Sequence, residues 1–377
     1  MLDTPIRPGL EGVVAAQTRL SSVDGQAGEL IIGGFAVEEL AGNATFEETI
    51  YLLWNDARPN AERLKEFRTQ LAAQRTLSSI TFDVLRAAAT AHVPAMDALR
   101  MAADTLSLDA AHAEPQQAAQ RLIAAFPTIV AAYWRLLNDQ QPIAPRDDLG
   151  HAANYLYMIF GEEPSAERVR ALETYLNTVV DHGLNASTFA ARVIISTQSD
   201  MVSAIVGAVG ALKGPLHGGA PGPALDMVFE IGEASKAEAY LRAKLERGER
   251  LMGFGHRVYK VRDPRAEVLS AAAARLFETD GDTSLYALAR EVERQAVRLL
   301  QEYKPGRNLQ TNVEFYTALL LHGLHLPTDL FTPTFAISRV AGWTAHCLEQ
   351  IAQNRIIRPQ SAYTGATGRR WVPVEER

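Results

Sequence analysis

Helical periodicity along almost the whole chain is the feature that most constrains its fold. Apolar residues recur at helical spacing through most of the 377 residues, whereas alternating, strand-like stretches are few and are concentrated in residues 13–34. Thr45 and Glu48 have the spacing of a capping box ahead of an apolar run, and Pro94 and Pro127 stand where helices are expected to begin. The sequence therefore predicts an all-α protein in which prolines separate successive helices.

Composition and charge exclude several classes of protein. The chain is 47% hydrophobic and 21% charged, which is enough apolar material for a large core and too little charge for disorder. The net charge of −7 argues against a nucleic-acid or anionic-membrane surface, so an anionic ligand requires a local basic pocket. The longest weakly polar run, residues 201–212, is too short to cross a bilayer, which needs about 20 residues.

The single cysteine and the N-terminus indicate the compartment. Cys347 has no second cysteine with which to form an internal disulfide or a thiolate metal site. The first residues, MLDTPIRPGLEG, lack the apolar stretch of a signal peptide. We therefore expect a cytoplasmic protein.

Familiar catalytic and cofactor motifs are weak in this chain. Gly253 and Gly255 form a G-x-G pair without the third glycine or the β-rich setting of a dinucleotide fold. His322 and His325 have no evident third ligand for a catalytic metal, and Ser187 lacks the G-x-S-x-G context of a hydrolase nucleophile. No metal and no cofactor is expected.

Histidines in turns are stronger candidates for chemistry. His182, His217 and His256 each lie in a glycine-rich or polar turn, where an imidazole can face a cleft. Residues 256–265 also carry four basic side chains against one acidic residue. This basic segment indicates a local anion site or, alternatively, a solvated helix face.

Several motifs, in one order along the chain, resemble those of the citrate synthase family. They are DHGLNASTFAARV, GALKGPLHGGA, GFGHRVYKVRDPRA, TNVEFYTALLL, FAISRVAGW and RIIRPQSAYTG. The resemblance covers nearly the full chain and is greatest to the short bacterial and archaeal members, which include 2-methylcitrate synthases. It implies an almost wholly helical fold, with a large domain at 1–217 and 324–377 and an inserted small domain at 218–323. It also implies a homodimer.

The resemblance assigns roles to individual residues. By analogy, His217, His256 and Glu314 are catalytic: His217 hydrogen-bonds the thioester oxygen, His256 polarises the ketone of oxaloacetate, and Glu314 is the base. His182, Arg265 and Arg339 would bind oxaloacetate, and Arg358 would reach the site of the neighbouring subunit. The CoA-binding positions implied are Leu216, Leu251, Met252, Gly253, Phe254, Gly255, Lys260, Arg262, Lys304 and Asn312.

Two positions depart from the commonest family pattern. Most members have Asp where this chain has Glu314, and one extra methylene moves the carboxylate by about 1 Å, which can cost on the order of 100-fold in rate unless the backbone compensates. We expect compensation and an active enzyme. Residues 221 and 222 replace a common Asn-Glu pair, so no contact is carried over to them.

The implied function is that of the citrate synthase of the tricarboxylic acid cycle, an acyltransferase that condenses acetyl-CoA with oxaloacetate and hydrolyses the thioester. Acetyl-CoA is a substrate here, and no cofactor is needed. Two alternatives stay open: a 2-methylcitrate synthase that takes propionyl-CoA, and a non-catalytic paralogue that binds acyl-CoA or a dicarboxylate. The helix expected at residues 204–212, AIVGAVGAL, is either a subunit contact or part of the core.

Overall fold

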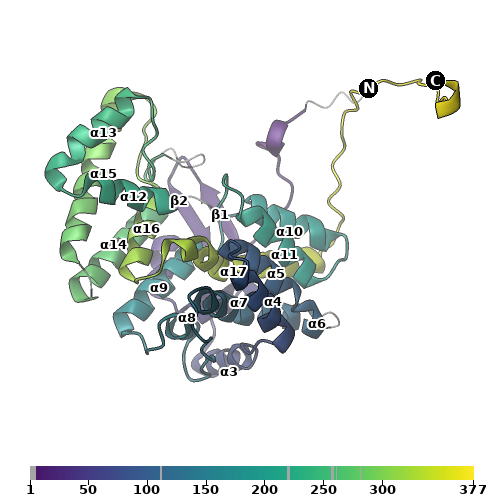
Figure 1. Ribbon diagram of the computed structural model, residues 1–377, viewed down its shortest axis with the longest axis horizontal. Coiled ribbons are helices and arrows are strands. Elements are labelled where there is room, and N and C mark those ends of the chain that lie inside the picture. Colours follow the sequence, from purple (N-terminus) through teal and green to yellow (C-terminus); the bar gives the residue numbers. More distant parts are fainter. Residues whose placement is uncertain (1–5, 111–112, 219–220, 256–258, 260, 281) are drawn as a thin grey trace.

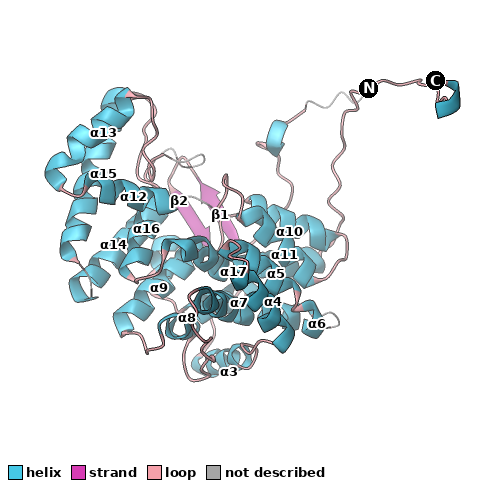
Figure 2. Cartoon of the chain, in the orientation of Figure 1, coloured by secondary structure: helices cyan, strands magenta, loops and turns pink. Residues whose placement is uncertain are grey.

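Helices make up most of the structure, as the periodicity predicts. The computed structural model describes residues 6–110, 113–218, 221–255, 259, 261–280 and 282–377. Figure 2 shows a body built of packed helices, with one small sheet near its centre. The all-α prediction is confirmed.

The helices fall into two groups along the chain. The first group comprises α1 (Val37–Ala41), α2 (Phe46–Asn55), α3 (Ala61–Ala72), α4 (Ser79–Thr90), α5 (Ala95–Asp104), α6 (Ser107–Ala110), α7 (Pro115–Leu137), α8 (His151–Phe160), α9 (Ala166–Val179), α10 (Ala186–Ser196), α11 (Met201–Leu212) and the last long helix, α17 (Phe331–Ala352). The second group comprises α12 (Pro221–Ile231), α13 (Ala237–Glu246), α14 (Pro264–Asp280), α15 (Thr283–Tyr303) and α16 (Val313–Gly323). The helices labelled in the second group gather at one end of the molecule (Figure 1).

The expected strand-like stretch forms a three-stranded antiparallel sheet. It consists of β1 (Ser21–Asp24), β2 (Glu29–Ile32) and β3 (Phe35–Ala36), in that order. Ser21 lies opposite Ile32, and Ile31 lies opposite Ala36. The sheet carries Ser21 to the turn that follows α9, where the candidate site begins.

Two of the three helix starts predicted from local sequence signals are confirmed. Thr45 and Glu48 form the capping box at the start of α2, and Pro94 directly precedes α5. The expectation that Pro127 begins a helix is wrong, because Pro127 lies inside the continuous helix α7. An interior proline costs a helix about 3 kcal/mol, and here the continuous burial of residues 121–133 of α7, which packs against α4, α5, α8 and α17, outweighs that cost.

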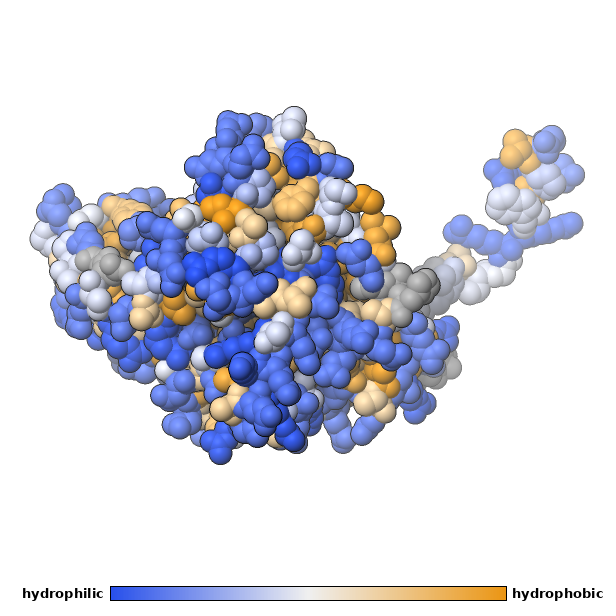
Figure 3. Space-filling view, turned by 90° about the horizontal axis from the view of Figure 1, so that it is seen from below, coloured by the Kyte–Doolittle hydropathy of each residue, from blue (hydrophilic) through white to orange (hydrophobic). Residues whose placement is uncertain are grey.

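α17 is the central element of the larger group. It packs against α7, α9, α10 and α11, and its Trp343 is fully buried. The segment after α17 runs away from the helical body (Figure 1) and carries exposed apolar side chains at Ile356, Tyr363 and Trp371. The face drawn in Figure 3 is mainly hydrophilic, with scattered apolar patches. Within the part of the chain that the structure describes, no helix has the length and apolarity needed to cross a bilayer.

Gly342 of α17 lies against the backbone that leads into the site. A Cβ added there would lie 2.2 Å from the Val180 carbonyl oxygen and 3.2 Å from a carboxylate oxygen of Asp181. We expect Gly342→Ala to lower the free energy of unfolding by about 1 to 3 kcal/mol, because rigid backbone on both sides cannot move apart easily. Gly42→Ala is the matched control, since its Cβ would meet nothing within 4 Å. Urea unfolding curves that coincide for the two variants would contradict this account.

Candidate active site

Residues 181–183 form a turn that is held from two sides. Asp181 is fully buried and accepts hydrogen bonds from Ser21 Oγ at 2.6 Å and from His346 Nε2 at 3.1 Å. Ser21 Oγ in turn accepts the N–H of Gly183 at 2.8 Å. Burial opposes ionisation of Asp181, but the interactions with His346 and Ser21 outweigh it, so the pKa of Asp181 lies below its usual value. The turn therefore presents His182 from a fixed backbone.

The His182 side chain faces Tyr259. Its Nε2 lies 3.1 Å from the Tyr259 hydroxyl, and the two rings meet edge to face at 5.7 Å between centroids. Tyr259 is 3% exposed, and the Arg265 guanidinium lies 5.6 Å from the centre of its ring. Tyr259 thus connects two residues that the sequence analysis assigns to oxaloacetate.

Two buried guanidinium groups differ in their partners. Arg265 donates to both carboxylate oxygens of Asp263, through Nε at 3.0 Å and Nη2 at 2.8 Å. Arg339 donates from Nε to the Val179 carbonyl oxygen at 2.8 Å. Among the described residues, no carboxylate lies within ion-pair distance of Arg339.

Arg339 therefore has an exceptional environment for a cation. It is 2% exposed, and burial together with the charge of Arg265 outweighs the attraction of Asp181, so its pKa falls to about 10. A buried cation without a direct counter-ion is costly, and an anionic ligand would remove much of that cost. The site can therefore bind a carboxylate.

The His217 ring is held by Ser187. The N–H of Ser187 donates to His217 Nε2 at 3.3 Å, and the Ser187 hydroxyl lies 2.8 Å from the same nitrogen. An Nε2 that accepts leaves the ring proton on Nδ1. Burial, aided by the charge of Arg339, lowers the pKa of His217 to about 4. His217 is thus a neutral imidazole near pH 7, and it can donate a hydrogen bond from Nδ1.

Ser187 is itself fixed by two helices. It lies in the first turn of α10, where its hydroxyl oxygen is 2.8 Å from the side-chain oxygen of the capping residue Asn185. It also accepts a hydrogen bond from Trp343 Nε1 of α17 at 3.0 Å. The orientation of His217 therefore depends on the large group of helices.

Glu314 lies in the first turn of α16. Asn312 caps this helix, and its side-chain oxygen accepts the N–H of Glu314 at 3.0 Å. Burial raises the pKa of Glu314, although the nearby charge of Arg265 opposes this effect. A carboxylate with a raised pKa, near the Arg265 guanidinium, is suited to proton abstraction.

Residues 251–255 are paired with the segment that leads to Glu314. Gly255 N–H donates to Gln310 O at 2.7 Å, and Asn312 N–H donates to Gly253 O at 3.0 Å. Gly253 has φ +84°, and a Cβ there would lie 2.9 Å from Phe315 Cβ, so glycine is required. Leu251 is buried, Met252 is partly buried, and Phe254 packs on Phe315 at 5.4 Å between ring centroids.

The remaining predicted residues lie in varied places. Leu216 is fully exposed, Lys304 is partly buried at the end of α15, and Arg358 is exposed on the segment after α17. Arg262 forms ion pairs with Glu267 at 3.0 Å and Glu293 at 3.3 Å. His256 and Lys260 lie outside the described residues.

The structure thus brings one set of predicted residues together through electrostatic and hydrogen-bonding contacts: His182, His217, Arg265, Glu314 and Arg339. Sequence reasoning missed Tyr259 and the positioning roles of Asp181 and His346, and it considered Ser187 only as a nucleophile. Asp181 directly precedes His182, and Tyr259 lies within the basic segment 256–265, so their positions in the sequence could have indicated both residues.

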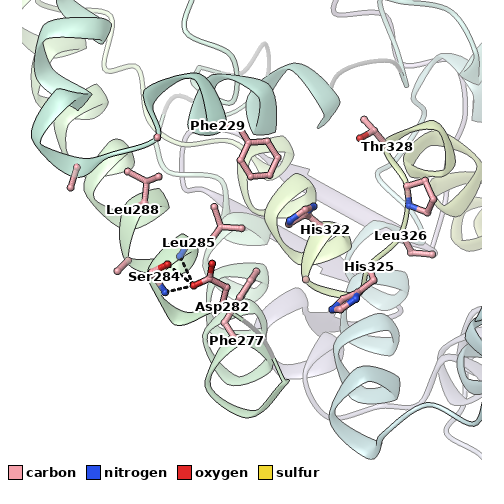
Figure 4. Close-up of a pocket in the computed structure, with 15 residues that line it drawn as sticks. Phe229, Phe277, Asp282, Ser284, Leu285, Leu288, His322, His325, Leu326 and Thr328 are labelled. Carbon is pink, nitrogen blue, oxygen red and sulfur yellow. Dashed lines mark hydrogen bonds between the residues drawn. The ribbon is translucent and has the colours of Figure 1, made fainter.

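A separate cavity of about 930 Å³ lies near the end of α16. Its lining includes Phe229, Phe277, Asp282, His322 and His325, whose side chains Figure 4 shows around the opening. Asp282 caps α15 through the N–H of Ser284 at 2.8 Å. None of the predicted site residues is among the residues that line it. Among the described residues, no cluster of His, Cys, Asp and Glu side chains could hold a metal ion.

Comparisons with known proteins agree with the family resemblance of the sequence motifs. The family "Citrate synthase, C-terminal domain" matches residues 9–360. Citrate synthase 2 of Bacillus subtilis is 43% identical, with 98% of each chain covered, and a 2-methylcitrate synthase of Shewanella oneidensis is 39% identical, covering 98% of this chain and 97% of that protein. The citrate synthase of Thermoplasma acidophilum, solved with carboxymethyl coenzyme A and oxaloacetate, is 30% identical with a TM-score of 0.88, covering 99% of this chain and 100% of that chain.

Proposed function

Because the chain belongs to the citrate synthase family, an acyltransferase family, we propose that it condenses acetyl-CoA with oxaloacetate and releases citrate and CoA. The observation that carries this proposal is the buried Arg339, which lacks a carboxylate partner among the described residues and whose charge acts on the neutral His217 and on Arg265. Arg265 in turn interacts with the partly buried Glu314. These are the groups that a dicarboxylate substrate and an enolising thioester require.

Oxaloacetate binds between the turn 181–183 and the two buried arginines. Arg265 and Arg339 hold its carboxylates, and His182 donates to it from a ring oriented by Tyr259. His256, which lies outside the described residues, polarises the ketone oxygen by analogy with the family. The substrate's negative charges add to the compensation that Asp263 gives Arg265 and Asp181 gives Arg339.

Proton transfer then makes the nucleophile. The methyl group of acetyl-CoA is a very weak acid, so its deprotonation requires a base and simultaneous stabilisation of the oxygen that gains charge. Glu314 takes the proton, and Nδ1–H of His217 donates to the thioester oxygen. The enol carbon attacks the ketone carbon of oxaloacetate, and the alkoxide that forms takes a proton. Water then cleaves the thioester to give citrate and CoA.

The two catalytic groups come from different parts of the chain, which supports closure between two domains. The small domain comprises residues 218–323 and the large domain comprises 1–217 and 324–377, so His217 belongs to the large domain and Glu314 to the small one. Closure excludes water until the carbon–carbon bond has formed.

CoA lies along the paired segment at residues 251–255, beside Leu216 and Asn312. Lys260, Arg262 and Lys304 supply positive charge for its phosphates, although the present ion pairs of Arg262 must then open or be shared. The working unit is a cytoplasmic homodimer in which Arg358 extends into the partner's site. The exposed, extended segment after α17 supports this arrangement.

The second candidate reaction is 2-methylcitrate synthesis from propionyl-CoA, which the relative in Shewanella oneidensis favours. The two substrates differ by one methyl group, which is worth only about 1 to 3 kcal/mol of discrimination. The test is kcat/KM for both acyl-CoAs with oxaloacetate. We expect a higher value for acetyl-CoA, and a higher value for propionyl-CoA would reverse the assignment.

The pH dependence of kcat follows from the burial of Glu314. The base acts as a carboxylate, so kcat falls as the pH decreases through its pKa, which burial raises above its ordinary value of 4.5. His217, with a pKa of about 4, stays neutral above that pH and adds no second loss of activity there. Initial rates at saturating substrates between about pH 5 and 9 measure this limb. If kcat of Glu314→Gln falls at the same pH midpoint as kcat of the wild type, the titrating group is not Glu314.

A further inference from the structure

The Glu293 carboxylate lies at the junction of three segments that carry site residues. Glu293 projects from α15 and is 8% exposed. One of its oxygens accepts from Thr311 Oγ1 at 2.8 Å and from Arg262 Nη2 at 3.3 Å, and the other accepts from Tyr316 Oη at 2.5 Å and from Arg290 Nη1 at 2.9 Å. A nearly buried carboxylate is stable only with donors of this kind.

Thr311 is the contact through which Glu293 reaches the site. It directly precedes Asn312, the residue that caps α16 and accepts the N–H of Glu314. Thr311 forms a β-bridge with Phe254, and its carbonyl oxygen accepts the N–H of Asp263 at 3.4 Å. The side chain of this one residue, which is 2% exposed, therefore fixes the segment before Glu314 relative to α15.

Two other hydrogen-bond donors, Tyr316 and Arg262, also link Glu293 to segments that carry proposed site residues. Tyr316 lies two residues after Glu314 in α16, and Arg262 precedes the Asp263–Arg265 pair by one residue. Glu293 thus connects α15, the start of α16 and the segment that holds the substrate arginine. Among the described residues, it contacts none of the proposed reacting groups.

We propose that Glu293, acting through Thr311, is a positioning residue that sets the place of the Glu314 carboxylate for proton abstraction. This inference rests on the proposed function, because it presupposes that Glu314 is the base. It also gives Arg262 a structural role beside Glu293. A displacement of about 1 Å at a catalytic group can reduce the rate by on the order of 100-fold.

The test compares variants that remove the Glu293–Thr311 hydrogen bond with variants that keep it. Thr311→Val removes the donor at nearly constant volume, and Glu293→Met removes the acceptor. We expect kcat to fall by about 10- to 100-fold in both variants, while the dissociation constant of oxaloacetate, measured by calorimetry, stays within about threefold. Thr311→Ser keeps the hydroxyl and retains kcat. Glu291→Gln, on the outer part of the same helix and paired with Arg294, is the matched control and also retains kcat.

A double variant shows whether the two residues act through one bond. If they do, Thr311→Val with Glu293→Met loses no more kcat than the more impaired single variant. The deuterium isotope effect on kcat with methyl-deuterated acetyl-CoA rises in the impaired variants, because proton abstraction becomes slower relative to the other steps.

Two results distinguish a failure of the positioning role from a failure of the proposed function. A folded Thr311→Val variant with kcat within twofold of a working wild type contradicts the positioning role alone. Failure of the wild type to release CoA from acetyl-CoA and oxaloacetate contradicts the proposed function, and the positioning role with it.

Discussion

Glu314→Gln is expected to lower kcat by a factor of about 10² to 10⁴ while oxaloacetate binding stays nearly intact. The amide has almost the same shape as the carboxylate but cannot take a proton from the methyl group of acetyl-CoA. Binding of oxaloacetate is preserved because its proposed ligands are His182, Arg265 and Arg339, which keep their own hydrogen bonds to Tyr259, Asp263 and the Val179 carbonyl oxygen. Steady-state rates of CoA release and calorimetric titration with oxaloacetate measure the two properties separately.

Glu314→Asp is the natural companion to this variant. It keeps the charge but withdraws the carboxylate by about 1 Å, so we expect activity between those of the wild type and Glu314→Gln. A Glu314→Gln protein within threefold of wild-type kcat would remove Glu314 from the role of base.

Arg358→Ala is expected to be nearly inactive if Arg358 serves the partner's site. Removing one member of a buried, hydrogen-bonded charge pair costs about 2 to 5 kcal/mol. Arg358 is exposed within its own chain, on the segment that follows α17, so its loss should leave the fold of each subunit unchanged. His217→Ala should also be inactive, because it removes the donor to the thioester oxygen.

Mixing these two inactive variants should restore activity. In a heterodimer, one site combines His217 of one chain with Arg358 of the other and is complete. Random exchange makes about half of the dimers heterodimers, each with one complete site, so roughly a quarter of wild-type activity should return. Subunit exchange is confirmed by native mass spectrometry. If exchange occurs and no activity returns, Arg358 does not act across the interface.

The sequence was sufficient for much of the fold because the helices carry their own signals. The capping box at Thr45 and the helical periodicity identify elements without any knowledge of their neighbours. Pro127 shows where such local reasoning fails: whether a proline ends a helix depends on how much packing the surrounding helices provide, and residues 121–133 of α7 are all buried. That packing depends on contacts with distant parts of the chain.

In the candidate site, too, some residues could be predicted from the sequence and others could not. The ordered motifs, through their resemblance to the citrate synthase family, predicted His182, His217, Arg265, Glu314 and Arg339 as site residues. The groups that orient them could not be predicted in the same way, since they come from remote segments. Ser187 lies 30 residues from His217, and His346 lies 165 residues from Asp181, so only the folded chain brings these pairs into contact.

Analysis of the product shows most directly whether this site joins the acetyl group to oxaloacetate. The purified protein is incubated with acetyl-CoA labelled with ¹³C in the acetyl group, with and without oxaloacetate. Free thiol is measured continuously, and the acids are identified by mass spectrometry. We expect labelled citrate and free CoA in equal amounts with oxaloacetate present, and almost no CoA without oxaloacetate. CoA released at the same rate without oxaloacetate, or no labelled citrate with both substrates present, would contradict the proposed condensation.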